Sequence, residues 1–200
     1  MQKLAILILL FISFDLRAQK NLTEGAKLLF QNTKTKITPT EKNDIYKKSN
    51  LCLSNDKKQF AIGGDVASLD HPFNAIVLPT DMNKDGKEEI FIIFGNSYTS
   101  GSTGTNVLLF IKDKAGVYQF NFGFSGTTPD IIPIKTPAYP DLLIGGPGIE
   151  FPIWRWNGKE YVFSKKITEK QLTKIKTISV ATASKDYVNN LKFPAGASHE

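Results

Sequence analysis

One segment of the 200-residue chain spaces oxygen-bearing side chains so that they could surround a cation. Residues 81–89 read DMNKDGKEE, with such side chains at the first, third, fifth and ninth positions. A hard cation such as calcium takes about 6–8 oxygen ligands at short range, so a loop must curl around it and direct alternate residues inward. The expected ligands are the side chains of Asp81, Asn83, Asp85 and Glu89 and the backbone carbonyl of Lys87.

The loop has two further features of a cation site, although it is not an EF-hand. Gly86 permits the tight turn after the third ligand, and four acids against two lysines give a formal charge of −2. Ile92 stands where an EF-hand has a bidentate glutamate, and the residues from Ile90 onward predict a strand. The same Asp and Asn spacing is also good turn chemistry, so a calcium site and a purely structural turn both stay open.

Residues 77–92, VLPTDMNKDGKEEIFI, resemble the calcium loop and following strand of FG-GAP/VCBS-type repeats. The segments DLLIGG (141–146) and IWRWNGKEY (153–161) are similar to the closing half of uncharacterised secreted bacterial proteins that carry one such unit. The resemblance implies calcium as the cofactor, bound by the side chains named above. A propeller needs several four-stranded blades, whereas this chain shows one clear loop, so we expect a single repeat-like unit.

Trp154 and Trp156 lie two residues apart in a predicted strand and therefore share a face. If exposed, they would form a stacking platform for a sugar ring or another flat ligand. If buried, they belong to the core, which is the favoured interpretation because aromatic side chains dominate core burial. The chain shows no hydrolase elbow, zinc motif or acid–base pair, so we name no catalytic residue and favour a protein that is not an enzyme.

The amino terminus is typical of a signal peptide over residues 1–18. A charged start precedes an apolar run from residue 4 to residue 14, and a small residue follows at position 18. The run is shorter than the roughly 20 residues of a membrane span, so we expect export to the periplasm or medium of a bacterium without stable membrane insertion after cleavage. Three further segments are predicted: a helix-prone segment 19–57, a β-rich core domain 58–165 and a helical tail 166–200.

The hydrophobic pattern predicts an α+β fold, mainly antiparallel β, with propeller-blade-like or sandwich-like sheets and short flanking helices. Strands are expected at 59–62, 75–78, 89–94, 106–112, 117–124, 131–134, 141–144, 151–156 and 160–163. Helices are expected near 22–30, from Thr38 onward, and at 184–191. Asn157-Gly158 predicts a two-residue hairpin turn. The aromatic residues at 118, 120, 122 and 124 alternate, which predicts that they share one face.

The formal charge of +6 is unevenly distributed. Residues 61–163 hold eleven acids against seven bases, whereas both flanking segments are rich in lysine. Arg155 is the only arginine after residue 18, so the bidentate contacts typical of nucleic-acid readers are largely missing and no nucleic-acid partner is expected. The single cysteine excludes a disulfide within the chain.

These observations predict an exported, non-enzymatic, β-rich protein with a calcium-binding loop. It would serve as a binding, interaction or structural module whose partner is an unknown protein or a glycan. The alternative is an envelope carbohydrate hydrolase, or an accessory to one, that uses the face of Trp154 and Trp156.

Overall fold

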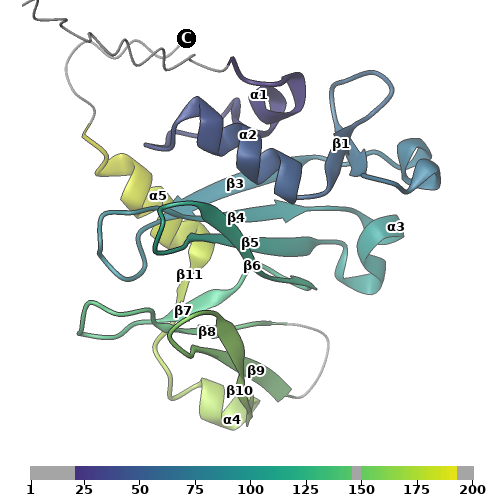
Figure 1. Ribbon diagram of the computed structural model, residues 1–200. Helices are drawn as coiled ribbons and strands as arrows, with labels where there is room; N and C mark the ends of the chain where they lie inside the picture. Colours follow the sequence, from purple (N-terminus) through teal and green to yellow (C-terminus); the bar gives the residue numbers. More distant parts are fainter. Residues whose placement is uncertain (1–20, 146–149, 193–200) are drawn as a thin grey trace, which may run out of the picture.

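The computed structural model describes residues 21–145 and 150–192, which form a helical layer on two stacked antiparallel sheets (Figure 1). The signal peptide predicted for residues 1–18 lies outside the described residues. Mostly antiparallel sheets with a few short helices confirm the predicted α+β class with mainly β content.

The central layer is a four-stranded sheet in which each strand pairs with the next in sequence. Its strands are β3 (Ala75–Thr80), β4 (Glu89–Phe94), β5 (Asn106–Lys112) and β6 (Tyr118–Ser125). Both faces of this sheet are covered, which explains why Ile90, Phe91 and Ile92 are apolar in succession and fully buried.

The helical layer covers one face of the central sheet. It contains α1 (Glu24–Phe30), α2 (Pro39–Lys48), the hairpin of β1 (Leu51–Leu53) with β2 (Phe60–Ile62), and the 3-10 helix η1 (Val66–Asp70). As predicted, α2 begins after Thr38. The Thr38 hydroxyl accepts a hydrogen bond from the Glu41 N–H, and the Glu41 carboxylate accepts one from the Thr38 N–H. Leu29, Ile45 and Phe94 belong to the core beneath these helices.

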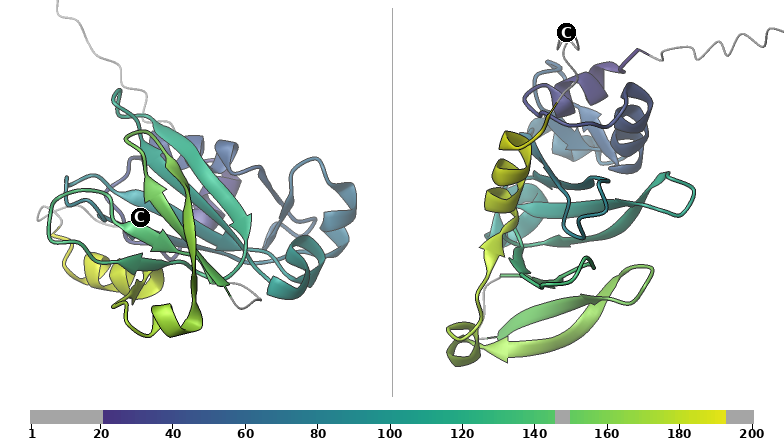
Figure 2. Two further views of the ribbon diagram at one scale, coloured as in Figure 1. Left: turned by 90° about the horizontal axis from the view of Figure 1, so that it is seen from below. Right: turned by 90° about the vertical axis from the view of Figure 1, so that its left-hand side faces the viewer.

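The second sheet packs against the other face of the central sheet (Figure 2). Its spatial order is β10 (Tyr161–Thr168), β9 (Glu150–Trp156), β8 (Asp141–Leu143), β7 (Asp130–Ile132) and β11 (Ile178–Ser179). Phe91, Leu109, Phe122 and Leu142 are buried in the core between the two sheets. On the outer face of the second sheet, Ile167 belongs to a smaller hydrophobic cluster. Leu172, the last residue of α4 (Glu169–Leu172), packs against this cluster.

The helix α5 (Val180–Asn189) follows β11 and runs along the side of the stack beside β3 (Figure 2). Val180 is fully buried in the core between the sheets. The helix thus starts four residues before the predicted 184–191 segment, with the Ser179 side chain accepting a hydrogen bond from the Thr182 N–H. Two short helices, α3 (Ser97–Ser100) and η2 (Gly101–Thr103), connect β4 to β5.

The expectation that the alternating aromatic residues of β6 share one face is wrong. The register of β6 against β5 shifts between Phe120 and Phe122, so Asn121 is an extra residue, as in a β-bulge. A one-residue shift moves the following side chains to the opposite face. Consequently Tyr118 is buried in the core beneath the helices, and Phe122 is buried between the sheets.

The hairpin between β9 and β10 also differs from its prediction. The strand pairing ends at Trp156 and Tyr161, and the Asn157 N–H donates a hydrogen bond of 3.0 Å to the Glu160 carbonyl. The two residues between this bonded pair are therefore Gly158 and Lys159, not the predicted Asn157 and Gly158. The side-chain oxygen of Asn157 accepts hydrogen bonds from the backbone N–H groups two and three residues later, at 2.9 Å each. Only Gly158 takes a positive φ, of 102°, so Asn157 acts through its side chain.

Candidate cation-binding loop and aromatic groove

The acidic loop connects β3 to β4 at the edge of the central sheet. The pairing of these strands continues to Thr80 and Glu89, which lie opposite each other at the neck of the loop. The strand pair therefore places the first and last predicted ligands, Asp81 and Glu89, next to the same end of the ladder.

The first three predicted side-chain ligands each accept a hydrogen bond from the backbone of the loop itself. Asp81 Oδ2 accepts from Gly86 N at 3.1 Å, and Asn83 Oδ1 accepts from Asp85 N at 3.2 Å. Asp85 Oδ1 accepts from Lys87 N at 2.8 Å. Each bond occupies part of the acceptor capacity of its side chain, because a carboxylate offers about four lone-pair sites. Oxygen atoms thus remain available for a cation.

Glu89, the fourth predicted side-chain ligand, is a buried carboxylate with 1% of its surface exposed. Its Oε2 accepts a hydrogen bond from Met82 N at 2.7 Å, and its Oε1 accepts one from the Tyr139 hydroxyl at 3.1 Å. Burial raises the pKa of Glu89 to about 8, and the nearby charges of Asp81 and Asp85 also raise it. The site therefore disfavours the ionised carboxylate when no cation is near.

Asp81 carries the one buried side-chain oxygen or nitrogen without a hydrogen-bond partner in the described part of the chain. This atom is Oδ1, whereas Oδ2 is bonded within the loop. Burial raises the pKa of Asp81, and the charge of Asp85 acts in the same direction. A buried acceptor without a partner costs about 1–3 kcal/mol, and more when it is charged. A cation beside Oδ1 would remove that cost.

The loop carboxylates are not drawn together around a common point. Within 21–145 and 150–192, no group of three or more His, Cys, Asp or Glu side chains is close enough to hold a metal ion. The donor set nevertheless fits a hard cation, since it consists of oxygens, carries a net negative charge and includes a buried oxygen without a partner.

The structure places Glu88, for which the residue pattern predicted no role, among the buried groups of the site. Its exposed fraction is 3%, and its carboxylate accepts hydrogen bonds from both ends of the described chain. The sequence did carry one signal of this role, because Glu88 occupies the eighth position of the loop, where such loops normally have an apolar residue. The partners that explain it are distant in sequence, so the pattern of residues 81–89 could not identify them.

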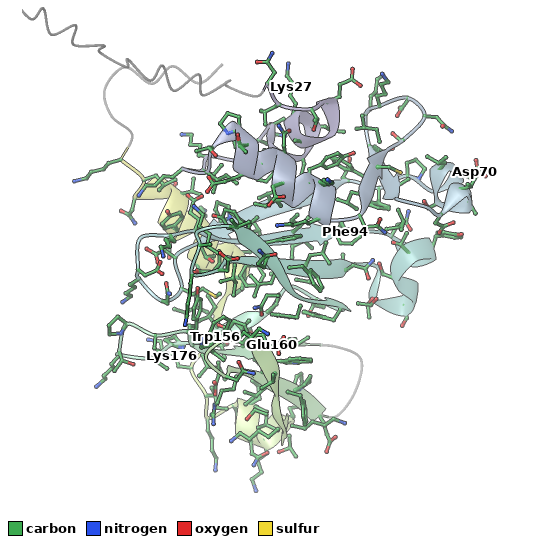
Figure 3. The ribbon with its side chains drawn as sticks, viewed as in Figure 1. Lys27, Asp70, Phe94, Trp156, Glu160 and Lys176 are labelled. Carbon is green, nitrogen blue, oxygen red and sulfur yellow. The ribbon has the colours of Figure 1, made fainter. Side chains whose placement is uncertain are left out.

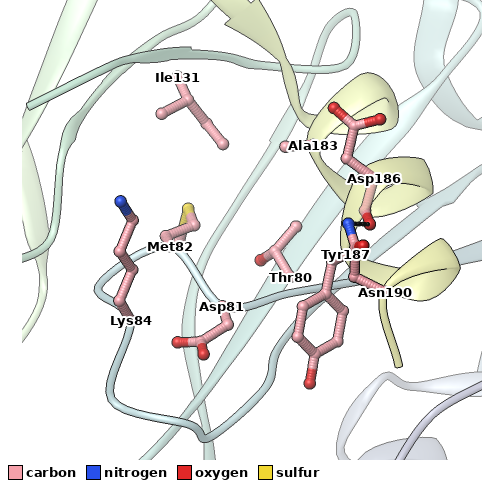
Figure 4. Close-up of a pocket in the computed structure, with 9 residues that line it drawn as sticks. All are labelled: Thr80, Asp81, Met82, Lys84, Ile131, Ala183, Asp186, Tyr187 and Asn190. Carbon is pink, nitrogen blue, oxygen red and sulfur yellow. Dashed lines mark hydrogen bonds between the residues drawn. The ribbon is translucent and has the colours of Figure 1, made fainter. Parts of the chain in front are cut away.

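A pocket of about 320 Å³ separates the loop from α5 (Figure 4). Asp81, Met82 and Lys84 line it from the loop. The opposite wall is formed by three residues of α5 and the residue that follows it. These are Ala183, Asp186 and Tyr187, and then Asn190.

The two tryptophans share a face of β9, and both pack against the core between the sheets. Trp156, at the end of β9, is labelled in Figure 3. The ring of Trp154 stacks on that of Phe122, with centroids 5.6 Å apart and planes at 7°. The ring of Trp156 lies 4.3 Å from that of Tyr139. Both tryptophans are partly buried, so the pair does not present an open platform.

A groove of about 690 Å³ lies between the turn that joins β5 to β6 and the turn that joins β9 to β10. Trp156 lines this groove, and Trp154 does not. Its polar lining residues include Lys114, Gln119, Asn121, Lys159 and Glu160. The structure therefore separates the predicted stacking pair, leaving one tryptophan beside a polar groove.

The layers and the acidic loop define the chain as a β-rich α+β protein with a candidate cation site between two adjacent strands. No helix in the described ranges is long and apolar enough to cross a membrane. No family model matches the chain, and neither a curated protein nor a solved structure matches it.

Proposed function

We propose that this chain is an exported, non-enzymatic binding or structural module whose loop at residues 81–89 binds calcium. The observation that carries the proposal is the buried, partnerless Oδ1 of Asp81 in the same loop as the buried carboxylate of Glu89. Two desolvated acids beside each other are unfavourable without a counter-charge. Calcium supplies that charge and accepts oxygen ligands.

The side chains of Asp81, Asn83, Asp85 and Glu89 and the carbonyl of Lys87 would hold the ion. The loop must contract to bring these atoms together, since they do not yet converge. Binding would fasten the ends of β3 and β4 to each other and stabilise the edge of the central sheet beside α5. The resemblance to one FG-GAP/VCBS-type unit supports the same assignment.

The partner of the module is proposed to be a protein or a glycan outside the cytoplasm, with no nucleic acid involved. The proposal of export rests on the signal-peptide pattern of residues 1–18. Arg155, the only arginine after that segment, is held by Asp141 through two hydrogen bonds of 3.0 and 2.7 Å. It is therefore poorly placed to read a phosphate or a base.

Calorimetric titration of residues 19–200 with calcium tests the site. We expect one site of micromolar to millimolar strength, roughly the range from sensors to extracellular modules. Asp85→Ala should abolish the heat, because Asp85 is an exposed ligand whose loss leaves the cores intact. Asp113→Ala is the matched control, since Asp113, like Asp85, accepts backbone hydrogen bonds in a turn but lies outside the loop. Absence of heat and of any melting shift with the unaltered chain would refute calcium binding.

A second candidate function is glycan binding in the groove beside Trp156. Its support is a groove of about 690 Å³ that combines two aromatic side chains, Phe120 and Trp156, with amides and charged groups. Small-molecule sites likewise combine aromatic surface with a few polar groups that fix the orientation of the ligand. Soluble hexose and N-acetylhexosamine oligosaccharides should change the tryptophan fluorescence of the unaltered chain and of Trp154→Phe, but not of Trp156→Phe. An equal response from both variants would count against the groove.

A further inference from the structure

Glu88, the eighth residue of the loop, is buried and accepts three hydrogen bonds at its carboxylate. The donors are the backbone N–H of Lys36 at 2.9 Å, the hydroxyl of Tyr187 at 3.1 Å and the hydroxyl of Thr35. Across the described residues, no lysine or arginine forms an ion pair with it. The buried carboxylate therefore depends on neutral hydrogen-bond donors to replace its lost hydration. Removing any one of these donors would destabilise it.

These donors come from the two ends of the described chain. Thr35 and Lys36 lie between α1 and α2, and Tyr187 lies on α5, 99 residues from Glu88 in sequence. The backbone carbonyl of Glu88 also accepts a hydrogen bond of 2.9 Å from the Tyr118 hydroxyl. Glu88 is thus the point at which the amino-terminal segment and the last helix are both attached to the loop.

Glu88 is flanked by two of the proposed cation ligands, the carbonyl of Lys87 and the carboxylate of Glu89. The side chains of Glu88 and Glu89 point to opposite faces, as successive residues do in an extended backbone. Glu88 contacts Thr35 on the helical side, whereas Glu89 contacts Tyr139 on the side of the second sheet. The backbone conformation that directs one of these side chains to its face therefore directs the other to the opposite face.

We infer that Glu88 is a positioning residue of the cation loop, and that it couples cation binding to the docking of α5 and of the segment before α2. This inference rests on the proposed calcium site. A cation that holds Lys87 and Glu89 orients Glu88 toward its donors. By thermodynamic linkage, donors that hold Glu88 must favour cation binding by the same factor.

The pocket between the loop and α5 is the space in which the two elements can move toward each other. Asp81 lines one wall and Tyr187 the other (Figure 4). Its volume of about 320 Å³ leaves space between the loop and α5 for the loop to contract around an ion. Coupling is therefore expected to tighten α5 against the loop.

Calcium affinity of Tyr187→Phe measures the coupling directly. This variant keeps the ring and removes only the hydroxyl that donates to Glu88. We expect its calcium affinity to fall about five-fold or more, the lower range for coupled sites. Tyr98→Phe is the matched control, because Tyr98 stacks on His71 away from the loop. In the unaltered chain, calcium should slow amide hydrogen exchange in α5.

The outcomes separate the coupling from the site on which it depends. If the unaltered chain binds no calcium, both the site and the coupling are wrong. If it binds calcium while Tyr187→Phe binds equally well and exchange in α5 is unchanged, only the coupling is overturned. Weaker binding by Tyr187→Phe together with slower exchange in α5 supports the coupling, since a purely structural hydrogen bond would not respond to calcium.

Discussion

Glu89 has a pKa of about 8 because it is buried, and two further acids lie near it. Its hydrogen bonds from Met82 and Tyr139 favour the ionised form but do not outweigh burial. A carboxyl group that is neutral when folded and ionised when unfolded links folding to proton uptake. The protonation state of Glu89 therefore contributes to the stability of the cation-free chain.

Without calcium, stability should fall as the pH rises from about 4.5 to about 8. The folded pKa of Glu89 lies above its ordinary value of 4.5, so in this window the folded state binds the extra proton. Denaturant unfolding in a chelator at pH 5, 6.5 and 8 measures the slope, and Glu89→Gln should flatten it. Saturating calcium should also flatten the slope, because the ion stabilises the carboxylate. A chelated chain whose stability rises across this window would contradict the assignment.

The spacing of Asp81, Asn83 and Asp85 was sufficient to predict a turn whose side chains accept hydrogen bonds from their own backbone, because that chemistry is local. Burial of Glu88 and Glu89 could not be predicted in this way. Their partners include Tyr187 and Tyr139, which only the packing of α5 and of the second sheet brings near.

Most strands were predictable as elements because their apolar residues are bounded by clear turn residues. β4 was predicted at its observed bounds, Glu89–Phe94. The extra residue at Asn121 was not predictable, since the alternation of aromatic residues continues unbroken through the bulge. The two-residue strand β11 carries too few residues for a periodic signal and forms only by pairing with β7.

The capping box of α2 provides a test at the scale of one element. Thr38→Ala removes the hydroxyl that accepts from Glu41 N at 3.3 Å, leaving an N-terminal amide without its protein partner. We expect a loss of about 1 kcal/mol in unfolding free energy. Urea denaturation measures it, and Thr38→Ser, which keeps a hydroxyl, should lie close to the unaltered chain. Equal losses for both substitutions would show that the methyl group, not the cap, is responsible.

Across the whole molecule, charge follows the layers. Residues 61–163, which include the central sheet and most of the second sheet, hold eleven acids against seven bases. Residues 19–60 and 164–200 hold sixteen lysines against seven acids. The acidic loop thus lies between two lysine-rich ends, and Glu88 accepts hydrogen bonds from both of them. This arrangement suits a cation inside the β region better than a polyanion bound to it.

A crystal structure determined in millimolar calcium, with anomalous scattering recorded, tests the central proposal most directly. We expect an anomalous peak in the loop at about 2.3–2.6 Å from side-chain oxygens of Asp81, Asn83, Asp85 and Glu89, with the carbonyl of Lys87 also coordinated. A loop that keeps its internal hydrogen bonds, with no ion beside Asp81 Oδ1 at saturating calcium, would contradict the proposal and leave residues 81–89 as a structural turn.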